Sequence, residues 1–377
     1  MKTLHVLGLP HTVTAKDSSC ETTQKIFRFC KMFENHPEYR VIHYGHNKSS
    51  TSAAEQVNVT SDEVLSSTYG SALESENKEY YDLAHRVFRS NAIREIRARK
   101  QKGDFLLAFN LDAKGVTDEV NVDSDMLVVE PSVTSAEAFS FFRCYESYPL
   151  KAAFAGTEGV SKEDPRWYWR VVPRSFDLEN YRSQDKETWA LYIVDSANPW
   201  GLSQAVQACA QAGIKLKVCG VVDLAVLGTT EWPENVEYLG EVSFTARADL
   251  LSKAYCGFLM SLRWEPFGPA AVEMMLSGCV PITADLGAMT EYIIDGLNGF
   301  RCNSLRDMVR AIQLTENLDR RKMMTFAANN FSASVVRPKY LRAFSDFEVV
   351  LNGEGWLDKS NAVDCVPLGL DYRALYM

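Results

Sequence analysis

The chain has 377 residues, more than one hydrophobic core usually holds, so we expect two domains. Hydrophobic residues make up 46% of the sequence and charged residues 24%, as in ordinary globular proteins. A formal net charge of −9 argues against a surface built mainly to hold nucleic acid, although it leaves room for a local basic groove.

No part of the sequence predicts a membrane segment. The opening residues, MKTLHVLGLPHT, contain an apolar run that is too short for a secretion signal, and no run reaches 18 apolar residues. The nine cysteines show neither a C-x-x-C pair nor a metal-like spacing, so we interpret them as reduced, buried thiols. We therefore expect a cytoplasmic protein.

Apolar, β-rich runs alternate with helical patterns along most of the chain. Helical spacing of apolar residues appears at 21–33, 202–211, 245–254 and 268–276. Such alternation is typical of parallel, doubly wound α/β sheets. The predicted strands are residues 3–9, 39–45, 104–110, 126–130, 189–194, 216–220, 257–260 and 280–283.

Two segments of different composition interrupt this alternation. Residues 157–175 are polar and contain prolines, which indicates the boundary between the two domains. Residues 47–76 are rich in Ser, Thr and acidic side chains, and we interpret them as a long surface loop or insertion. In each domain, ligands are expected where the carboxyl ends of the strands face a cleft.

Residues 263–281, RWEPFGPAAVEMMLSGCVP, predict a turn that leads into a short helix. Pro269 suits the first helical turn, where a missing N–H costs little. Gly268 and Ala270 are small, so the backbone N–H groups at this helix start could approach an anion closely. The helix start therefore predicts a phosphate site.

Two glutamates flank this predicted phosphate site. Glu265 precedes the helix, and Glu273 follows about one and a half turns into it, so both can lean towards the same place. Carboxylates accept paired hydroxyl hydrogen bonds, which suits the ribose and hexose of a sugar nucleotide. The alternative is a helix whose acidic residues only complement its dipole.

The stretch 235–312 resembles the C-terminal donor domain of retaining GT-B glycosyltransferases, a family marked by the motif E-P-F-G-x4-E. It reads VEYLGEV, then the turn and helix above, then SGCVPITADLGAMTEYIIDGLNGF. Segments HVLGLPHT, SCETTQKIFRFCKMF, VIHYG, FRCYESY and PRWYWRVVPRSFDLENY look like a subgroup found in bacteria and large viruses. Further positions that match the family pattern are Gly278, Pro281, Ile282, Gly287, Glu291, Gly296, Gly299 and Phe300.

The resemblance implies an α/β protein of the GT-B class, with two Rossmann-like domains of doubly wound parallel sheets facing across a cleft. The implied parts are an acceptor-side domain at 1–165, a donor domain at 175–333, a helix at 334–351 that crosses back, and a tail at 352–377. The implied activity is a retaining, metal-independent transfer of a hexose or pentose from a nucleoside-diphosphate sugar, most simply a UDP-sugar. The acceptor is a saccharide or glycoconjugate hydroxyl, no further cofactor is expected, and a viral enzyme would act in the host cytoplasm.

The resemblance also assigns roles to single residues. Glu273 is expected to bind the ribose, and Glu265 the transferred sugar. Backbone N–H groups of 267–270 are expected to bind sugar oxygens and the diphosphate, and Gly8 to line the cleft from the opposite side. His11 follows the first strand, and we consider a role for it in acceptor binding or as a general base. The full predicted set is Glu265 and His11 as catalytic residues and Glu273, Phe267, Gly268, Pro269, Ala270, Arg263, Gly8, Arg174 and Gly220 as donor-binding residues.

One departure from the family pattern concerns the diphosphate. The family places an Arg and a Lys-Gly after the first strand of the donor domain, whereas this chain has Asp195 and Trp200-Gly201 there. Arg263, Arg174 and Arg247 are candidates to replace the missing cations. If none does so, the protein is a GT-B protein that binds without catalysing.

A second alternative is a DNA glycosyltransferase acting on hydroxymethylated bases, as some phage enzymes do. Residues 86–102, RVFRSNAIREIRARKQK, are strongly basic and could face a polyanion. They also fit the solvated face of an amphipathic helix. The acidic VDSD stretch at 122–125 is interpreted as an exposed loop, and no metal site is predicted.

Overall fold

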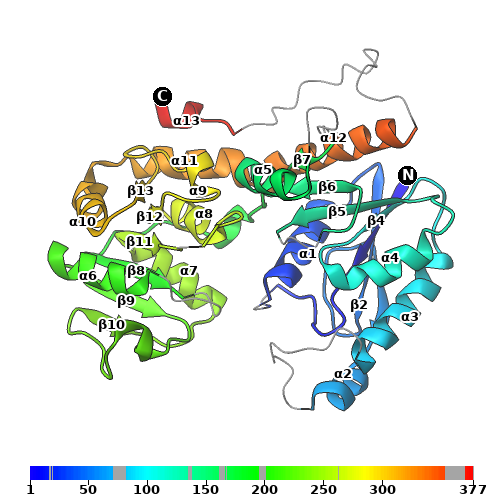
Figure 1. The fold of residues 1–377 in the computed structure, drawn as a ribbon, viewed down its shortest axis with the longest axis horizontal. Coiled ribbons are helices and arrows are strands. Elements are labelled where there is room, and N and C mark those ends of the chain that lie inside the picture. Colours follow the sequence, from blue (N-terminus) through cyan, green and yellow to red (C-terminus); the bar gives the residue numbers. More distant parts are fainter. Residues whose placement is uncertain are drawn as a thin grey trace. The chain divides into compact units, whose positions relative to one another are not determined.

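The computed structural model describes the chain except for residues 17, 19, 71–81, 135–137, 161–165, 167, 195–200, 262, 353–369 and 377. Two compact units, each with its own sheet, make up the fold (Figure 1). The N-terminal unit contains the described residues of Met1–Glu146, Phe154–Ser175 and Val336–Val366. The C-terminal unit contains those of Ser147–Ala153, Phe176–Val335 and Pro367–Met377. The predicted C-terminal helix at 334–351 therefore lies almost wholly in the N-terminal unit.

The N-terminal unit is built on a parallel seven-stranded sheet of order β3-β2-β1-β4-β5-β6-β7. The order reverses between β1 and β4, the place where doubly wound sheets bind ligands. Neighbouring strands are in register at Leu4 with Val41 and with Phe105. The strands are β1 Lys2–Leu7, β2 Tyr39–His46, β3 Glu55–Thr60, β4 Phe105–Leu107, β5 Leu127–Val133, β6 Phe142–Tyr145 and β7 Arg170–Val171.

Helices cover both faces of this sheet (Figure 1). On one face, Phe88 of α3 and Val116 of α4 share a cluster with Ile42 and Leu106 of the strands. On the other face, Phe344 of α12 packs against Phe105 of β4 with the two rings tilted. The helices are α1 Glu21–Met32, α2 Asp62–Tyr69, α3 Leu83–Arg97, the 3-10 turn η1 Leu111–Ala113, α4 Lys114–Val120 and α12 Ala333–Leu351. Helix α5, Tyr148–Thr157, is divided between the two units, with its residues up to Ala153 in the C-terminal unit.

The prediction of a long loop at 47–76 is wrong for its described central part. Residues Glu55–Thr60 form β3, which pairs in parallel with β2 at the edge of the sheet, and Asp62–Tyr69 form α2. Val57 and Val59 alternate with polar residues and are buried, so an edge strand needs only these two apolar side chains. The polar composition reflects the exposed edge rather than a loop.

The C-terminal unit is built on a parallel six-stranded sheet of order β10-β9-β8-β11-β12-β13. This is again a doubly wound order, which reverses between β8 and β11. The strands are β8 Trp189–Ile193, β9 Lys215–Cys219, β10 Val236–Tyr238, β11 Cys256–Leu259, β12 Val280–Ala284 and β13 Phe300–Cys302. The parallel, doubly wound architecture predicted from the alternation of elements is confirmed.

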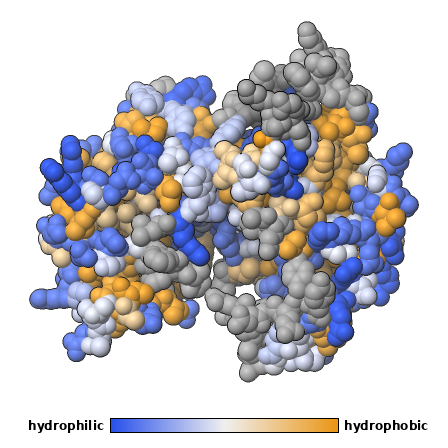
Figure 2. All heavy atoms as spheres, in the orientation of Figure 1, coloured by the Kyte–Doolittle hydropathy of each residue, from blue (hydrophilic) through white to orange (hydrophobic). Residues whose placement is uncertain are grey.

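Successive residues of β8 face opposite helical layers. Leu191 packs with Leu251 of α7 and Met274 of α8, whereas Ala190 shares a cluster with Ala205 of α6. On the face shown in Figure 2, this unit is mostly hydrophilic with scattered hydrophobic residues. The remaining elements are η2 Leu178–Asn180, α6 Leu202–Ala212, η3 Leu224–Leu227, α7 Phe244–Lys253, α8 Pro269–Leu276, α9 Met289–Tyr292, α10 Leu305–Leu314, η4 Thr315–Asn317, α11 Arg320–Phe331 and α13 Arg373–Tyr376.

The described residues bear on the expectations about membrane helices and about the cysteines. Among them, no helix combines the length and apolar character needed to cross a bilayer. The described cysteines are unpaired, and all of them except Cys20 are buried, as expected for thiols that pack as small hydrophobes.

Candidate functional site

The E-P-F-G motif forms a tight turn between β11 and α8. Gly268 caps α8 in the left-handed conformation, with φ 75° and ψ 62°, and Pro269 is the first helical residue. A Cβ atom on Gly268 would lie 2.3 Å from Cε of Met289, the flexible end of a side chain, so it is the left-handed conformation that favours glycine here. The backbone N–H groups at the start of α8 are those that a helix leaves without acceptors within itself.

Glu265 is held in place through its backbone. The amide of Ala288 donates to the Glu265 carbonyl oxygen at 2.9 Å. Gly287, with φ 61°, packs so closely that a Cβ atom there would lie 2.4 Å from the same oxygen. The loop after β12 therefore supports the motif, while the Glu265 side chain remains partly exposed.

Glu273 is a buried carboxylate with partners from two other elements. Only 4% of the residue is exposed. The Tyr181 hydroxyl donates to Oε1 at 3.2 Å, and Arg247 of α7 forms an ion pair with Oε2. The positive charge of Arg247 compensates the buried negative charge of Glu273. Arg247 is one of the three arginines considered for the diphosphate, and it contacts the motif directly.

Phe267 contributes its backbone rather than its ring to this turn. Its side chain is 1% exposed and packs against Phe176 and Phe331. The Tyr292 hydroxyl lies 2.5 Å from the Phe267 carbonyl oxygen and 3.0 Å from that of Gly268. The ring anchors the turn in the core, so the role predicted for Phe267 in donor binding depends on its backbone groups.

The other predicted residues of the C-terminal unit lie at strand ends. Gly220 follows β9 with φ 112°, and a Cβ atom there would lie 2.7 Å from the Val194 carbonyl oxygen. Arg263 is exposed beside Trp264, which is 48% exposed. Asp195 and Trp200, which stand where the family carries its cations, lie outside the described residues.

Gly8 and Arg174 belong to the N-terminal unit. The Gly8 amide donates to the Tyr44 carbonyl oxygen at 2.8 Å, so this N–H group is already used within the sheet. Arg174 is buried, and its Nη2 bonds Glu146 Oε2 at 2.9 Å and also Glu21. Arg174 thus neutralises two carboxylates of its own unit, and we remove it from the groups proposed for the diphosphate.

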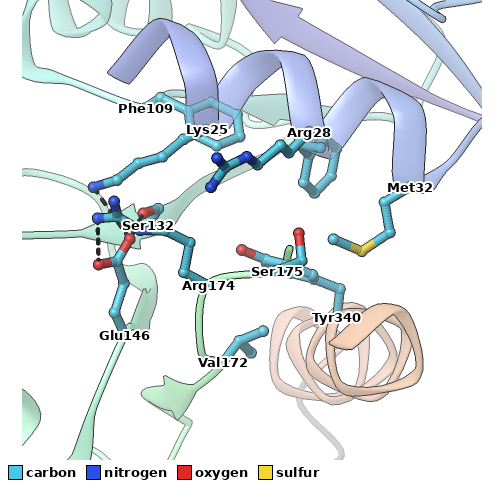
Figure 3. A pocket seen from close by; sticks show the side chains of 11 residues that line it. Lys25, Arg28, Met32, Phe109, Ser132, Glu146, Val172, Arg174, Ser175 and Tyr340 are labelled. Carbon is cyan, nitrogen blue, oxygen red and sulfur yellow. Dashed lines mark hydrogen bonds and ion pairs between the residues drawn. The ribbon is translucent and has the colours of Figure 1, made fainter. Parts of the chain in front are cut away.

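This charged group lines a small cavity of about 20 Å³ (Figure 3). Lys25 lies 3.1 Å from Glu146 Oε1, and the Ser132 hydroxyl donates to the same oxygen at 2.5 Å. Burial alone would raise the pKa of Glu146, but the charges of Arg174 and Lys25 outweigh it and lower that pKa. Because every member has an opposite charge beside it, the group is a structural ion cluster.

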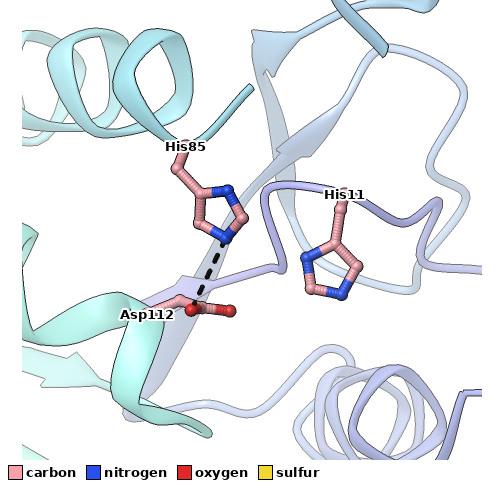
Figure 4. A group of neighbouring side chains, drawn as sticks. All are labelled: His11, His85 and Asp112. Atoms are coloured by element: carbon pink, nitrogen blue, oxygen red, sulfur yellow. Dashed lines mark ion pairs between the residues drawn. The ribbon is translucent and has the colours of Figure 1, made fainter. Parts of the chain in front are cut away.

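His11 lies on the loop after β1, close to His85 of α3 and Asp112 of η1 (Figure 4). The His11 and His85 ring centroids are 5.7 Å apart, and His85 Nε2 lies 3.6 Å from Asp112 Oδ1. Burial lowers the pKa of His85, but Asp112 and Asp82 outweigh burial and raise it above the ordinary value. Sequence reasoning singled out His11 and missed both neighbours.

The basic stretch at 86–102 is an amphipathic helix followed by a turn, with most of its cations paired. Phe88, Ile93 and Ile96 are buried, as the amphipathic interpretation predicts. Ion pairs join Arg89 to Glu119, Arg94 to Glu95, Arg99 to Glu55 and Glu95, and Lys100 to Asp125. These contacts favour the solvated-face interpretation over a surface for a polyanion.

Comparison with known proteins agrees with the fold. Residues 177–330, less than half of the chain, match the family model described as "Glycosyl transferases group 1". AviGT4, a glycosyltransferase involved in avilamycin A biosynthesis, is similar over 94% of this chain and 99% of that chain, with 14% identity and a TM-score of 0.62. Anabaena HepE in complex with UDP-glucose is similar over 92% of this chain and 100% of that chain, with 14% identity and a TM-score of 0.60.

A curated relative in Klebsiella pneumoniae is an uncharacterised 41.2 kDa protein of the cps region. It is 28% identical over 127 residues, or 30% of this chain, and the match spans 33% of its own length. The two sheets and these likenesses define a GT-B fold. The matched family model adds a glycosyltransferase group 1 domain in the C-terminal unit, which supports a glycosyltransferase.

Proposed function

We propose that this protein transfers a sugar from a nucleoside-diphosphate sugar to an acceptor hydroxyl with retention of anomeric configuration. The observation that carries the proposal is the E-P-F-G turn at the start of α8. There Glu265 is held by its backbone, and the buried Glu273 lies within the residues that match the family model. The alternative is that the glutamates only complement the helix dipole. An exposed carboxylate would do that equally well, whereas Glu273 is buried and has two partners.

In the proposed donor complex, each motif group has one task. The Glu273 carboxylate accepts hydrogen bonds from the two ribose hydroxyls, and Glu265 accepts them from the transferred sugar. Backbone N–H groups at the start of α8 bind sugar oxygens and the diphosphate. The UDP-glucose bound to Anabaena HepE supports a UDP-sugar as the first donor to test.

The negative charge of the diphosphate needs cations close to it. This chain lacks the Arg and Lys-Gly of the family pattern, so other arginines must provide the positive charge. Arg247 already contacts Glu273, and Arg263 lies exposed just before the motif. We assign both to the leaving diphosphate, whose charge grows as the bond to the anomeric carbon breaks. In this proposal the arginines and the helix N–H groups stabilise the leaving group without a metal at the diphosphate.

A saccharide or glycoconjugate is the proposed acceptor. The DNA alternative depends on the basic stretch at 86–102, and the ion pairs of that stretch leave less charge for a polyanion. A DNA-binding measurement at about 50 mM salt distinguishes the two, because phosphate contacts are strongest at low salt. We expect no binding of hydroxymethylated duplex there.

The donor site is tested by calorimetry and thermal shift with UDP-, GDP-, ADP- and TDP-sugars. We expect one nucleotide to bind the wild-type protein and Glu273→Gln to weaken it by about 10- to 100-fold, because a charge-assisted hydrogen bond contributes about 1.5–3 kcal/mol. Glu316→Gln, at an exposed position of the same unit, is the matched control and should bind like the wild type.

Turnover separates an enzyme from a protein that only binds. We expect slow hydrolysis of the preferred donor in the absence of acceptor. The sugar should first be released with the same anomeric configuration that it has in the donor. Binding without any turnover, across a panel of saccharide acceptors, would favour the non-catalytic alternative. If no nucleotide binds, the proposed donor site is wrong.

A further inference from the structure

Three potential metal ligands meet at the carboxyl edge of the N-terminal sheet. His11 comes from the loop after β1, Asp112 from η1 directly after β4, and His85 from the first turn of α3. β1 and β4 are the strands between which the sheet order reverses. The topology therefore gathers these side chains where doubly wound folds place their ligands.

Their spacing fits one shared ion. One ligand atom from each residue lies within 4.8 Å of the others. Two ligands of a tetrahedral zinc ion stand about 3.3 Å apart, since each bond is close to 2 Å long. His85 Nε2 and Asp112 Oδ1, at 3.6 Å, are already near that separation, and a shared ion requires the partly exposed His11 side chain to move closer to them.

Hydrogen bonds behind the ligands orient them in the manner of a metal site. His85 Nδ1 lies 2.8 Å from Asp82 Oδ1, and the Tyr69 hydroxyl donates to Asp82 Oδ2 at 2.6 Å. The Asn110 amide donates to Asp112 Oδ2 at 2.5 Å, which leaves Oδ1 towards His85. Carboxylates that hold the far nitrogen of a ligating histidine recur behind protein metal ions.

The tautomer that Asp82 favours leaves His85 Nε2 able to bind a cation that Asp112 also contacts. When Nδ1 donates its proton to Asp82, Nε2 carries a lone pair that faces the Asp112 carboxylate. Two such acceptors repel each other unless a positive charge lies between them. A proton on His85 Nε2 can supply this charge, and so can a metal ion, which a separation of 3.6 Å accommodates.

We propose that His11, His85 and Asp112 bind a divalent transition-metal ion, and that Zn²⁺ is the preferred one. Two imidazole nitrogens and one carboxylate oxygen suit zinc better than Mg²⁺ or Ca²⁺, which prefer oxygen ligands. Asp112 as ligand and Asp82 behind His85 together balance the two positive charges. Three protein ligands leave a fourth position open to water or to another oxygen ligand.

The proposal is tested on the full-length protein, stripped with EDTA and then dialysed against Zn²⁺. We expect one zinc ion per chain by elemental analysis, and visible absorption bands when Co²⁺ replaces it. His11→Gln and Asp112→Asn should each weaken zinc binding at least about 100-fold, since both remove a ligand. Asp82→Asn keeps a residue that caps α3 but removes its charge, and we expect a loss of about 10- to 100-fold.

His36→Gln, at a histidine far from the cluster in sequence and absent from it, is the matched control and should keep the wild-type affinity. Circular dichroism of each variant in EDTA checks that it folds. The proposal is overturned if the wild type retains no zinc, or if His11→Gln and Asp112→Asn bind it as the wild type does. Zinc binding is measured without a sugar nucleotide, so its failure would leave the proposed transfer reaction untouched.

Discussion

Glu146 shows how much a single buried charge in the N-terminal unit depends on its neighbours. The residue is 3% exposed, and Arg174 and Lys25 are the cations that contact it. Removing one member of such a cluster leaves the others buried without compensation, which costs more than the cluster contributes as a whole. The stability of this unit is therefore sensitive to each member.

At this position we predict that Glu146→Gln lowers the free energy of unfolding by about 3 kcal/mol, because two buried cations lose a shared carboxylate. Urea denaturation followed by circular dichroism measures the change. Glu34→Gln, at an exposed carboxylate of the same unit, should change the value by less than about 0.5 kcal/mol. Equal effects at the two positions would contradict the role given to the cluster.

The same carboxyl predicts how stability depends on pH. Its pKa in the folded protein lies below the ordinary value of 4.5, so between the two values the unfolded chain binds more protons. The contribution of Glu146 is therefore present above about pH 4.5 and is lost as the pH falls below that value. We plot the free energy of unfolding against pH from pH 3 to pH 7. Below about pH 4.5 this plot should be flatter for Glu146→Gln than for the wild type, and parallel plots would argue against the lowered pKa.

At the scale of elements, the loop between β12 and α9 holds the motif turn in place. Gly287 packs against the backbone of Glu265, and the Ala288 amide bonds the same residue. Backbone atoms cannot rotate away from a new Cβ atom as a side chain can. Any side chain at position 287 must therefore displace the turn that carries Glu265.

We predict that Gly287→Ala destabilises the C-terminal unit by about 3 kcal/mol and weakens sugar-nucleotide binding. Gly296→Ala is the control, because Gly296 has a similar φ of 73° and open space around its Cβ position. It should cost about 1–2 kcal/mol, the strain of the left-handed conformation alone. Thermal unfolding and calorimetry measure both effects, and similar losses in the two variants would mean that strain rather than packing decides.

At the scale of the whole molecule, a segment from the end of the chain completes the N-terminal unit. Helix α12 begins at Ala333, and from Val336 onwards it belongs to that unit. Phe344 packs on Phe33 and Phe105, and the Tyr340 hydroxyl donates to the Pro131 carbonyl oxygen at 2.8 Å. The core of the first unit is therefore incomplete without α12.

We predict that Phe344→Ala costs about 3–5 kcal/mol and acts on the N-terminal unit alone. Hydrogen exchange should accelerate in β4, Phe105–Leu107, and remain unchanged in β11, Cys256–Leu259. Leu351→Ala, at a residue that is 48% exposed, is the control and should leave both strands as they are. Equal acceleration in the two strands would show that both units unfold together.

The sequence by itself determined the local elements and the motif. Apolar runs predicted the central strands, and the spacing of 263–281 predicted the turn at Gly268 and the helix at Pro269, because these features depend on near neighbours in the chain. It failed at β3, where only two buried valines mark an edge strand. The predicted roles of Glu265, Glu273 and the other site residues stay predictions until donor binding is measured.

Only the tertiary structure decided which distant side chains meet. It paired Arg247 with Glu273 and Arg174 with Glu146 and Glu21, and it brought His85 and Asp112 to His11. Such contacts join residues from different strands and helices, and no periodicity in the chain records them. The reason is physical: a doubly wound sheet brings together the ends of strands that are far apart in sequence, so its sites exist only once the strand order is fixed.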